Sequence, residues 1–180
     1  MNGPKLPYRD RREAGQVLAA QLAHYRDTPG VLVLGLARGG IPVAAEVAKA
    51  LGAPLDVFVV RKLGYPGHEE YAIGAIAGGG VRVMKQLPGL QLTPEQVERV
   101  AAREQQELER REALYRAGRR APEVRGRTVV VIDDGLATGA TMEAGVRALR
   151  QMGPQRICVA VPVAAPDACN LFRGLADEVV

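Results

Sequence analysis

Short apolar segments alternate along this chain with segments of helical periodicity, and this alternation limits the possible folds more than any other feature. Val31–Ala37 and Thr128–Ile132 are rich in Val, Leu and Ile and lack the polar alternation of a strand with one solvated face. The first is followed by a helical pattern with Pro42 in its first turn and Gly52 at its C-terminal end. Strands buried on both faces and joined by helices are typical of a right-handed parallel sheet. The sequence therefore predicts an α/β fold, a flavodoxin-like or Rossmann-like parallel sheet flanked by helices.

The remaining regular elements follow the same alternation. Strands are expected at Leu55–Val60, 156–164 and 177–180, and helices at Asp10–Tyr25, 141–153 and 166–176. A length of 180 residues fits a single domain spanning 1–180. Because the sequence stops inside an apparent strand, we expect that a C-terminal piece completes the fold.

Residues 65–120 differ in character and are expected to form a lid, a small β-rich excursion and a charged helix inserted in the domain. Gly78–Gly80 would be the turn of the excursion. The helix is predicted over Thr93–Arg120, with Thr93 and Gln96 forming a capping box. Its apolar seam is thin, and Glu and Arg neighbours cover the rest. Two alternatives remain for this helix: it lies solvated across the core, or it forms a dimer seam.

Composition excludes several classes of protein. A net charge of +4, aromatic residues at 4% and the absence of Trp give little indication of nucleic-acid binding. Cys158 and Cys169 lie in apolar segments without metal-ligand or disulfide spacing, so they are predicted to be buried, reduced thiols. The N-terminus has no apolar signal segment, and no run approaches the ~18 apolar residues of a membrane span. We therefore expect a cytoplasmic protein without a membrane segment.

Two adjacent acids, Asp133 and Asp134, follow the strand that ends at Ile132 and precede the small-residue segment "GLATGAT". In open α/β sheets, ligands bind beyond the carboxyl ends of the strands. Small residues at a helix N-terminus let a phosphate approach the backbone amides, and carboxylates accept hydrogen bonds from vicinal ribose hydroxyls. Together these features predict a site for a ribose 5-phosphate. The alternative is a capping Asp beside a solvated acid, which needs only one Asp and no "TGAT".

The segment "VVVIDDGLATGAT" resembles the thirteen-residue phosphoribosyl-pyrophosphate (PRPP) motif of type I phosphoribosyltransferases at every position. The resemblance implies the type I fold with a small hood. It also implies that Asp133 and Asp134 bind the ribose hydroxyls and take part in catalysis. The residues implied to grip the 5′-phosphate are Gly135, Leu136, Ala137, Thr138, Gly139, Ala140 and Thr141.

A second segment, "LARGGIPVAAEVA", resembles the pyrophosphate loop of that family, which often contains a strained peptide bond. The residues implied to bind the diphosphate there are Ala37, Arg38, Gly39 and Gly40. From the residues alone, "RGG" before a helix is more often just a turn.

A third segment, "VVRKLGYPGHEE", places Arg61 and Lys62 after the second strand, where the family usually has a basic residue that touches the pyrophosphate. The alternative for these two cations is an exposed strand end. The polar, Gly- and Pro-rich part that follows fits a mobile lid over the substrate. His68 within it is a candidate proton donor or diphosphate contact, although a lone loop histidine is more often idle.

The resemblance implies an enzyme that transfers 5-phosphoribose from PRPP to a nitrogenous base and releases pyrophosphate. Mg²⁺ would be carried by PRPP and sensed by Asp133 and Asp134 through the sugar or water, without direct ligation. A homodimer is expected. Members that act on 6-oxopurines tend to carry an acid at the position of Ala137, so hypoxanthine and guanine are disfavoured as acceptors.

The identity of the acceptor base is left open by the sequence. A hood that reads it could come from Met1–Gly30, Tyr65–Gln91 or Thr93–Arg120, and none carries a base-reading signature. The alternative function is a non-catalytic regulatory protein that senses PRPP or a nucleotide. A third alternative is a flavodoxin-like receiver, which also needs acids at strand ends. It is disfavoured because "TGAT" would have no role in it.

Overall fold

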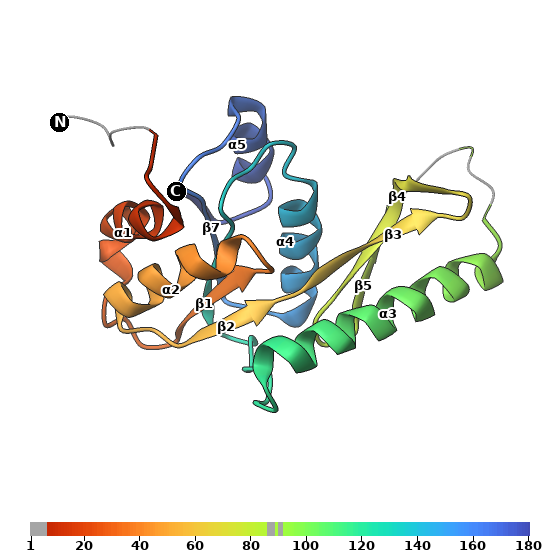
Figure 1. Cartoon of the computed structure of the whole chain (residues 1–180), viewed down its shortest axis with the longest axis horizontal. Helices are drawn as coiled ribbons and strands as arrows, with labels where there is room; N and C mark the ends of the chain where they lie inside the picture. Colours follow the sequence, from red (N-terminus) through yellow and green to blue (C-terminus); the bar gives the residue numbers. More distant parts are fainter. Residues whose placement is uncertain (1–6, 86–88, 90–91) are drawn as a thin grey trace.

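The computed structural model describes residues 7–85, 89 and 92–180. It consists of an α/β body and a projecting insert, which we define as Val60–Arg116 (Figure 1). Residues 1–6, 86–88 and 90–91 lie outside the described residues, and they belong to two of the three segments considered above for a hood.

The body is built on five parallel strands in the order β2-β1-β6-β7-β8. Their bounds are β1 Val31–Leu36, β2 Leu55–Phe58, β6 Thr128–Ile132, β7 Arg156–Ala160 and β8 Glu178–Val179. Every residue of β1 is buried, as are all but the first of β6 and of β7. Strands of a parallel sheet are covered on both faces, so this burial follows from the apolar runs of the sequence. The predicted parallel α/β sheet is confirmed.

Helices cover both faces of this sheet, and successive strand residues point to opposite sides. On one side, α1 (Arg11–Gln21), the short 3₁₀ turn η1 (Ala23–Tyr25) and α2 (Gly40–Leu51) pack over Val33 and Val130. On the other side, α4 (Ala140–Met152) and α5 (Pro166–Arg173) pack over Leu34 and Val131. The carboxyl ends of β1 and β6 therefore lie between two helical layers.

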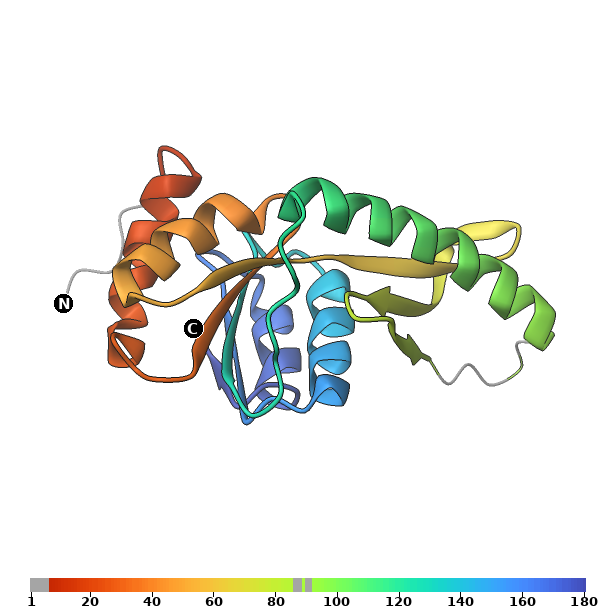
Figure 2. The ribbon, with the colours of Figure 1, turned by 90° about the horizontal axis from the view of Figure 1, so that it is seen from below.

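The insert is a three-stranded antiparallel sheet, β3-β4-β5, with the long helix α3 lying along it (Figure 2). The bounds are β3 Val60–Tyr65, β4 His68–Ala77, β5 Val81–Met84 and α3 Pro94–Arg116. The predicted capping box at Thr93 and Gln96 is present. Val100, Ala101 and Leu108 of the apolar seam of α3 pack on Leu63 and other buried residues of the insert sheet, whereas Leu114 is exposed.

Several boundaries differ from those expected: α1 ends at Gln21 and α5 at Arg173, each a few residues early. The segment predicted as one strand, Leu55–Val60, divides at Val59: β2 joins the parallel sheet, and β3 continues into the antiparallel one. The strand expected at 156–164 ends at Ala160. The charged helix ends at Arg116, because Ala117 and Gly118 have positive φ angles, 49° and 83°.

The segment expected to be a lid loop, Gly64–Glu70, is a β-hairpin whose turn is Pro66–Gly67 and whose strand register shifts at Gly64. Gly67 has a φ of 81°, which favours glycine, so the residues that suggested flexibility form a tight turn instead. Closure of this hairpin over a substrate stays a prediction.

Two expectations about the chain as a whole can be compared with the structure. Cys158 is buried and Cys169 is half-buried, and both are free thiols. In the described part of the chain, no helix has both the length and the apolar sequence required to cross a bilayer.

Candidate functional site

Two loops meet at the carboxyl ends of the adjacent strands β1 and β6. Gly35 lies opposite Ile132 in the parallel register, so the loop Ala37–Gly40 and the acid pair leave the sheet side by side. The sequence predicted these two segments separately as ligand-binding loops. The topology brings them together.

Glycine is required in this loop because the acid pair approaches its backbone closely. A Cβ atom added to Gly39 would overlap the Asp134 carboxylate, and one added to Gly40 would overlap the carbonyl oxygen of Ile132. The φ of Gly39 is −62°, which any residue can adopt, so lack of space and not backbone conformation selects glycine there. The peptide bond between Ala37 and Arg38 is cis, and Arg38 is exposed.

Asp133 is a half-buried acid at the base of this site. Burial raises the pKa of its carboxyl group to about 6, and the neighbouring Asp134 charge adds to the rise. The backbone amide of Asp134 opposes this rise by donating a hydrogen bond of 2.9 Å to Asp133 Oδ1. The site therefore holds a carboxyl group that changes its charge just below neutral pH.

Asp134 already has a partner, which sequence reasoning missed. The guanidinium group of Arg11, at the start of α1, lies 2.8 Å (Nε) and 2.7 Å (Nη2) from Asp134 Oδ2. Both side chains are partly exposed to solvent. Arg11 lies 123 positions before Asp134, and no spacing in the sequence links the two. The cluster "DRR" at the helix start was the only available signal.

The loop from Gly135 to Thr141 is fixed at two points and exposed between them. Leu136 is buried, and it pairs with the segment after β7 through hydrogen bonds from Leu136 N to Val163 O (3.0 Å) and from Ala165 N to Leu136 O (2.9 Å). Gly139, with φ 72°, contacts Phe172 so closely that a Cβ atom would lie 2.8 Å from the ring.

The residues around these two fixed points are solvent-exposed, and they are Ala137, Thr138, Ala140 and Thr141. Gly139 is the N-cap of α4 and supplies no side-chain hydrogen bond. Ala140 N donates a long hydrogen bond of 3.5 Å to Thr138 Oγ1, and the next N–H groups of the first turn remain available to a ligand. This arrangement suits an anion such as a phosphate.

The two predicted cations of the insert have different surroundings. Arg61 points to α3, where its Nε donates a hydrogen bond of 2.9 Å to Glu104 Oε2. Lys62 points the opposite way, as alternation along β3 requires, and lines a pocket with Ala140 and other residues of α4. Arg61 is thus engaged inside the insert, whereas Lys62 faces the body.

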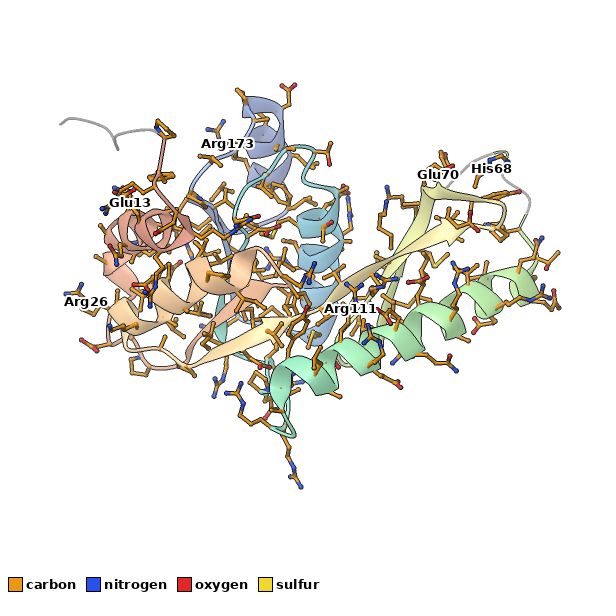
Figure 3. The ribbon with its side chains drawn as sticks, viewed as in Figure 1. Glu13, Arg26, His68, Glu70, Arg111 and Arg173 are labelled. Atoms are coloured by element: carbon orange, nitrogen blue, oxygen red, sulfur yellow. The ribbon has the colours of Figure 1, made fainter. Side chains whose placement is uncertain are left out.

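His68 is exposed at the start of β4. Figure 3 shows it beside Glu70 at the tip of the β3–β4 hairpin, at the end of the insert farthest from the body. In this conformation the structure does not bring His68 to the acid pair.

Comparisons with known proteins agree with this geometry. The model of the phosphoribosyl transferase domain family matches residues 11–171. A Mycobacterium tuberculosis protein, provisionally named a phosphoribosyl transferase, is 46% identical over 173 residues, which are 95% of this chain. The chain spans 39% of that relative's length.

Solved structures give the same result. A crystal structure from Thermus thermophilus has a TM-score of 0.85 and 45% sequence identity, with 97% of this chain and 83% of that chain covered. The purine phosphoribosyltransferase of Pyrococcus horikoshii shares the fold at a TM-score of 0.56 and 20% identity, with 97% and 84% covered. The chain therefore belongs to the phosphoribosyl transferase domain family and has the type I phosphoribosyltransferase fold.

Proposed function

We propose that this protein is a phosphoribosyltransferase that moves 5-phosphoribose from PRPP to a nitrogenous base and releases pyrophosphate. The observation that carries the proposal is the close contact of Gly39 and Gly40 with the acid pair and Ile132. This contact places a glycine-containing loop and the exposed cation Arg38 beside two carboxylates and the N-terminus of α4. PRPP carries a diphosphate, two ribose hydroxyls and a 5′-phosphate, which match these three features in turn.

Each group of the substrate has a candidate partner. The ribose hydroxyls would donate hydrogen bonds to Asp133 and Asp134, and the 5′-phosphate would accept them from the loop and the first turn of α4. The diphosphate would lie against Arg38–Gly40 with Lys62 as a further cation. Arg61 would first have to leave Glu104, so Lys62 is the better-placed cation of the insert.

Magnesium would enter with the substrate. Among the described residues there is no group of three or more His, Cys, Asp or Glu side chains that could hold a metal ion. Mg²⁺ keeps several waters and is often bound by one or two carboxylates plus substrate phosphates, so the pair Asp133 and Asp134 fits this mode. When bound, the ion would neutralise charge on the departing diphosphate.

The reaction breaks the bond between the anomeric carbon and a diphosphate oxygen and forms a bond from that carbon to the acceptor nitrogen. The electron pair of the broken bond leaves with pyrophosphate, and the displaced proton of the acceptor goes to water. The transition state would resemble an oxocarbenium ion. The acceptor nitrogen is itself the nucleophile, so none from the protein is needed. The residues named above would act by holding the ribose and the leaving group in position and by stabilising developing charge.

The test is release of pyrophosphate from PRPP and Mg²⁺ with a panel of purines, pyrimidines and pyridines. We expect turnover with at least one base. The rate of pyrophosphate release should fall at least 100-fold in Asp133→Asn/Asp134→Asn and stay unchanged in Asp167→Asn, an exposed control on α5. Since the position of Ala137 is exposed and has no acid, we expect hypoxanthine and guanine to be poor acceptors. Binding of PRPP without turnover across the panel would contradict the enzyme and support a sensor.

A further inference from the structure

A pocket of about 470 Å³ lies between α4 and the insert sheet, outside the loops assigned above to PRPP. Its lining includes neither the acid pair nor the loop Ala37–Gly40. It shares only Ala140 with the 5′-phosphate loop and only Lys62 with the predicted diphosphate contacts. Its volume falls in the range of pockets that bind small molecules, about 300–1,000 Å³.

The polar lining is strongly basic. Lys62, Lys85 and Arg147 contribute three cations and Glu143 one carboxylate, which leaves a formal charge of +2. Within the described residues, neither lysine is in ion-pairing distance of a carboxylate. Like charges gathered around one hollow repel each other, so a bound anion would relieve that repulsion.

Arg147 is held in place by its neighbour one turn earlier. Its Nε and Nη2 lie 3.0 Å and 2.9 Å from Glu143 Oε1, so this carboxylate engages one edge of the guanidinium group. The Nη1 group takes no part in these contacts and can donate to a ligand. Glu143 therefore positions Arg147 without occupying all of its donors.

The rest of the lining is apolar and small. Ala140 and Ala144 lie one turn apart on α4, on the same face as Glu143 and Arg147. Facing them are residues of the insert sheet, which are Ala72, Gly74, Ala75, Val83 and Met84. A ligand that fills this pocket would thus have an anionic end near the cations and an apolar or planar body between the two walls.

We propose that this pocket binds a small organic phosphate monoester, a ligand of the size and polarity of a nucleoside monophosphate, at a site separate from the PRPP loops. A phosphate monoester carries about −1.5 to −2 charges at pH 7 and matches the charge of the lining, whereas a single carboxylate would leave an excess of positive charge. Binding there would not require the acid pair, because in the described part of the chain no residue lining the pocket forms a hydrogen bond or ion pair with Asp133 or Asp134.

Calorimetric titration with phenyl phosphate tests the proposal, since this probe combines a phosphate monoester with a planar apolar body. The wild type is expected to bind two molecules, one at the 5′-phosphate loop and one in the pocket. Lys85→Met/Arg147→Met should weaken binding in the pocket at least tenfold. Thr138→Ala/Thr141→Ala should weaken binding at the 5′-phosphate loop. Lys49→Met on α2, exposed and remote from the pocket, serves as the control.

The two pairs of substitutions separate the failure of this proposal from the failure of the proposed function. If only the threonine substitutions change the titration, the pocket is not a phosphate site. If inorganic phosphate binds the pocket as tightly as phenyl phosphate does, the apolar walls contribute nothing and the assignment of an organic ligand is wrong. If sedimentation finds a dimer that Lys85→Met/Arg147→Met dissociates while phosphate binding is unchanged, the pocket is a contact between copies, and the proposal fails.

Discussion

The stability of this protein depends on pH through Asp133, because burial disfavours the charged form of its carboxyl group. Its pKa rises from 3.8 to about 6 on folding, because burial disfavours the carboxylate. The native protein therefore binds more protons than the unfolded chain between these values. The stability contributed by the neutral form is fully present below pH 3.8 and is lost as the pH rises through 6.

We expect Asp133→Asn to remove this component of the pH dependence. A shift of about two units corresponds to about 2.7 kcal/mol unscreened, and partial exposure to solvent reduces this to about 1 kcal/mol. Urea unfolding of wild type and variant at pH 4, 5, 6 and 7 measures it: the wild type should lose stability relative to the variant as the pH rises. A constant difference across this range would contradict the assignment. Asp167→Asn, exposed on α5, should show no such trend.

Arg11 occupies Oδ2 of Asp134, one of the two carboxylates that the proposed function assigns to the ribose hydroxyls. A hydroxyl that binds this oxygen would displace the guanidinium group, and an exposed ion pair of this kind contributes about 0.2–1 kcal/mol. We expect Arg11→Gln to bind PRPP up to about fivefold more tightly than Arg12→Gln. Arg12 pairs instead with Glu46, so its substitution removes the same charge without freeing Asp134. Weaker calorimetric binding by Arg11→Gln than by Arg12→Gln would mean that Arg11 contacts the substrate itself.

At the scale of elements, a buried ion pair joins the end of α3 to β2. Arg116 Nε donates to Asp56 Oδ2 at 2.9 Å, and its Nη2 donates to Val57 O at 3.3 Å. Glu112 Oε1 is 2.9 Å from Arg116 Nη1 but lacks normal hydrogen-bond geometry, so Asp56 is the principal partner. Both Arg116 and Asp56 are buried. The long helix is thereby attached to the parallel sheet.

Removing one member of this pair would leave an uncompensated buried charge. We expect Arg116→Met to destabilise the fold by about 3–5 kcal/mol and Asp56→Leu/Arg116→Met to recover much of that loss. Denaturant unfolding followed by circular dichroism measures both. Arg110→Met, which breaks an exposed pair with Glu107 on the same helix, should cost under about 1 kcal/mol. Equal effects of Arg116→Met and Arg110→Met would show that burial does not govern the contribution of this pair.

Sequence reasoning succeeded where the determinants are local. The apolar runs predicted the buried parallel strands, and Thr93 with Gln96 predicted the start of α3. Both features are determined by residues that are close together in the sequence. It failed at Val59, where a continuous β-type segment changes from one sheet to another, since propensity does not specify the pairing partner.

In the candidate site too, features determined by local sequence were predicted and features determined by tertiary packing were not. Asp133 to Thr141 form one contiguous motif, and their loop lies where the sequence placed it, at the carboxyl end of β6. The contact of Arg11 with Asp134 depends on how α1 packs over the finished sheet. The pocket lined by Lys62, Lys85 and Arg147 depends on how the insert sheet packs against α4. These juxtapositions arise from tertiary packing and have no local signature.

At the scale of the whole molecule, binding of PRPP should be visible as thermal stabilisation. A ligand at 100 times its Kd adds about 2.7 kcal/mol to the free energy of unfolding. For a chain of this size, that corresponds to a rise in Tm of roughly 5–10 °C. We expect this rise with PRPP and Mg²⁺, measured by differential scanning calorimetry, and no rise in Asp133→Asn/Asp134→Asn. Ribose 5-phosphate should give a smaller shift, because it lacks the diphosphate; an equal shift would count against the role of Arg38–Gly40.

The ion pair between Asp56 and Arg116 has a consequence for how proteins of this architecture can diverge. Asp56 lies just before the insert begins and Arg116 is its last residue, so the pair closes the insert into a loop at its base. The entropy of closing a flexible loop grows only logarithmically, by about 0.6 kcal/mol for each doubling of length. Beyond this closure, the segment could lengthen, shorten or be replaced while the parallel sheet keeps its register. The fold thus separates the parallel sheet, which carries the proposed phosphate-binding loops, from a segment whose length can change.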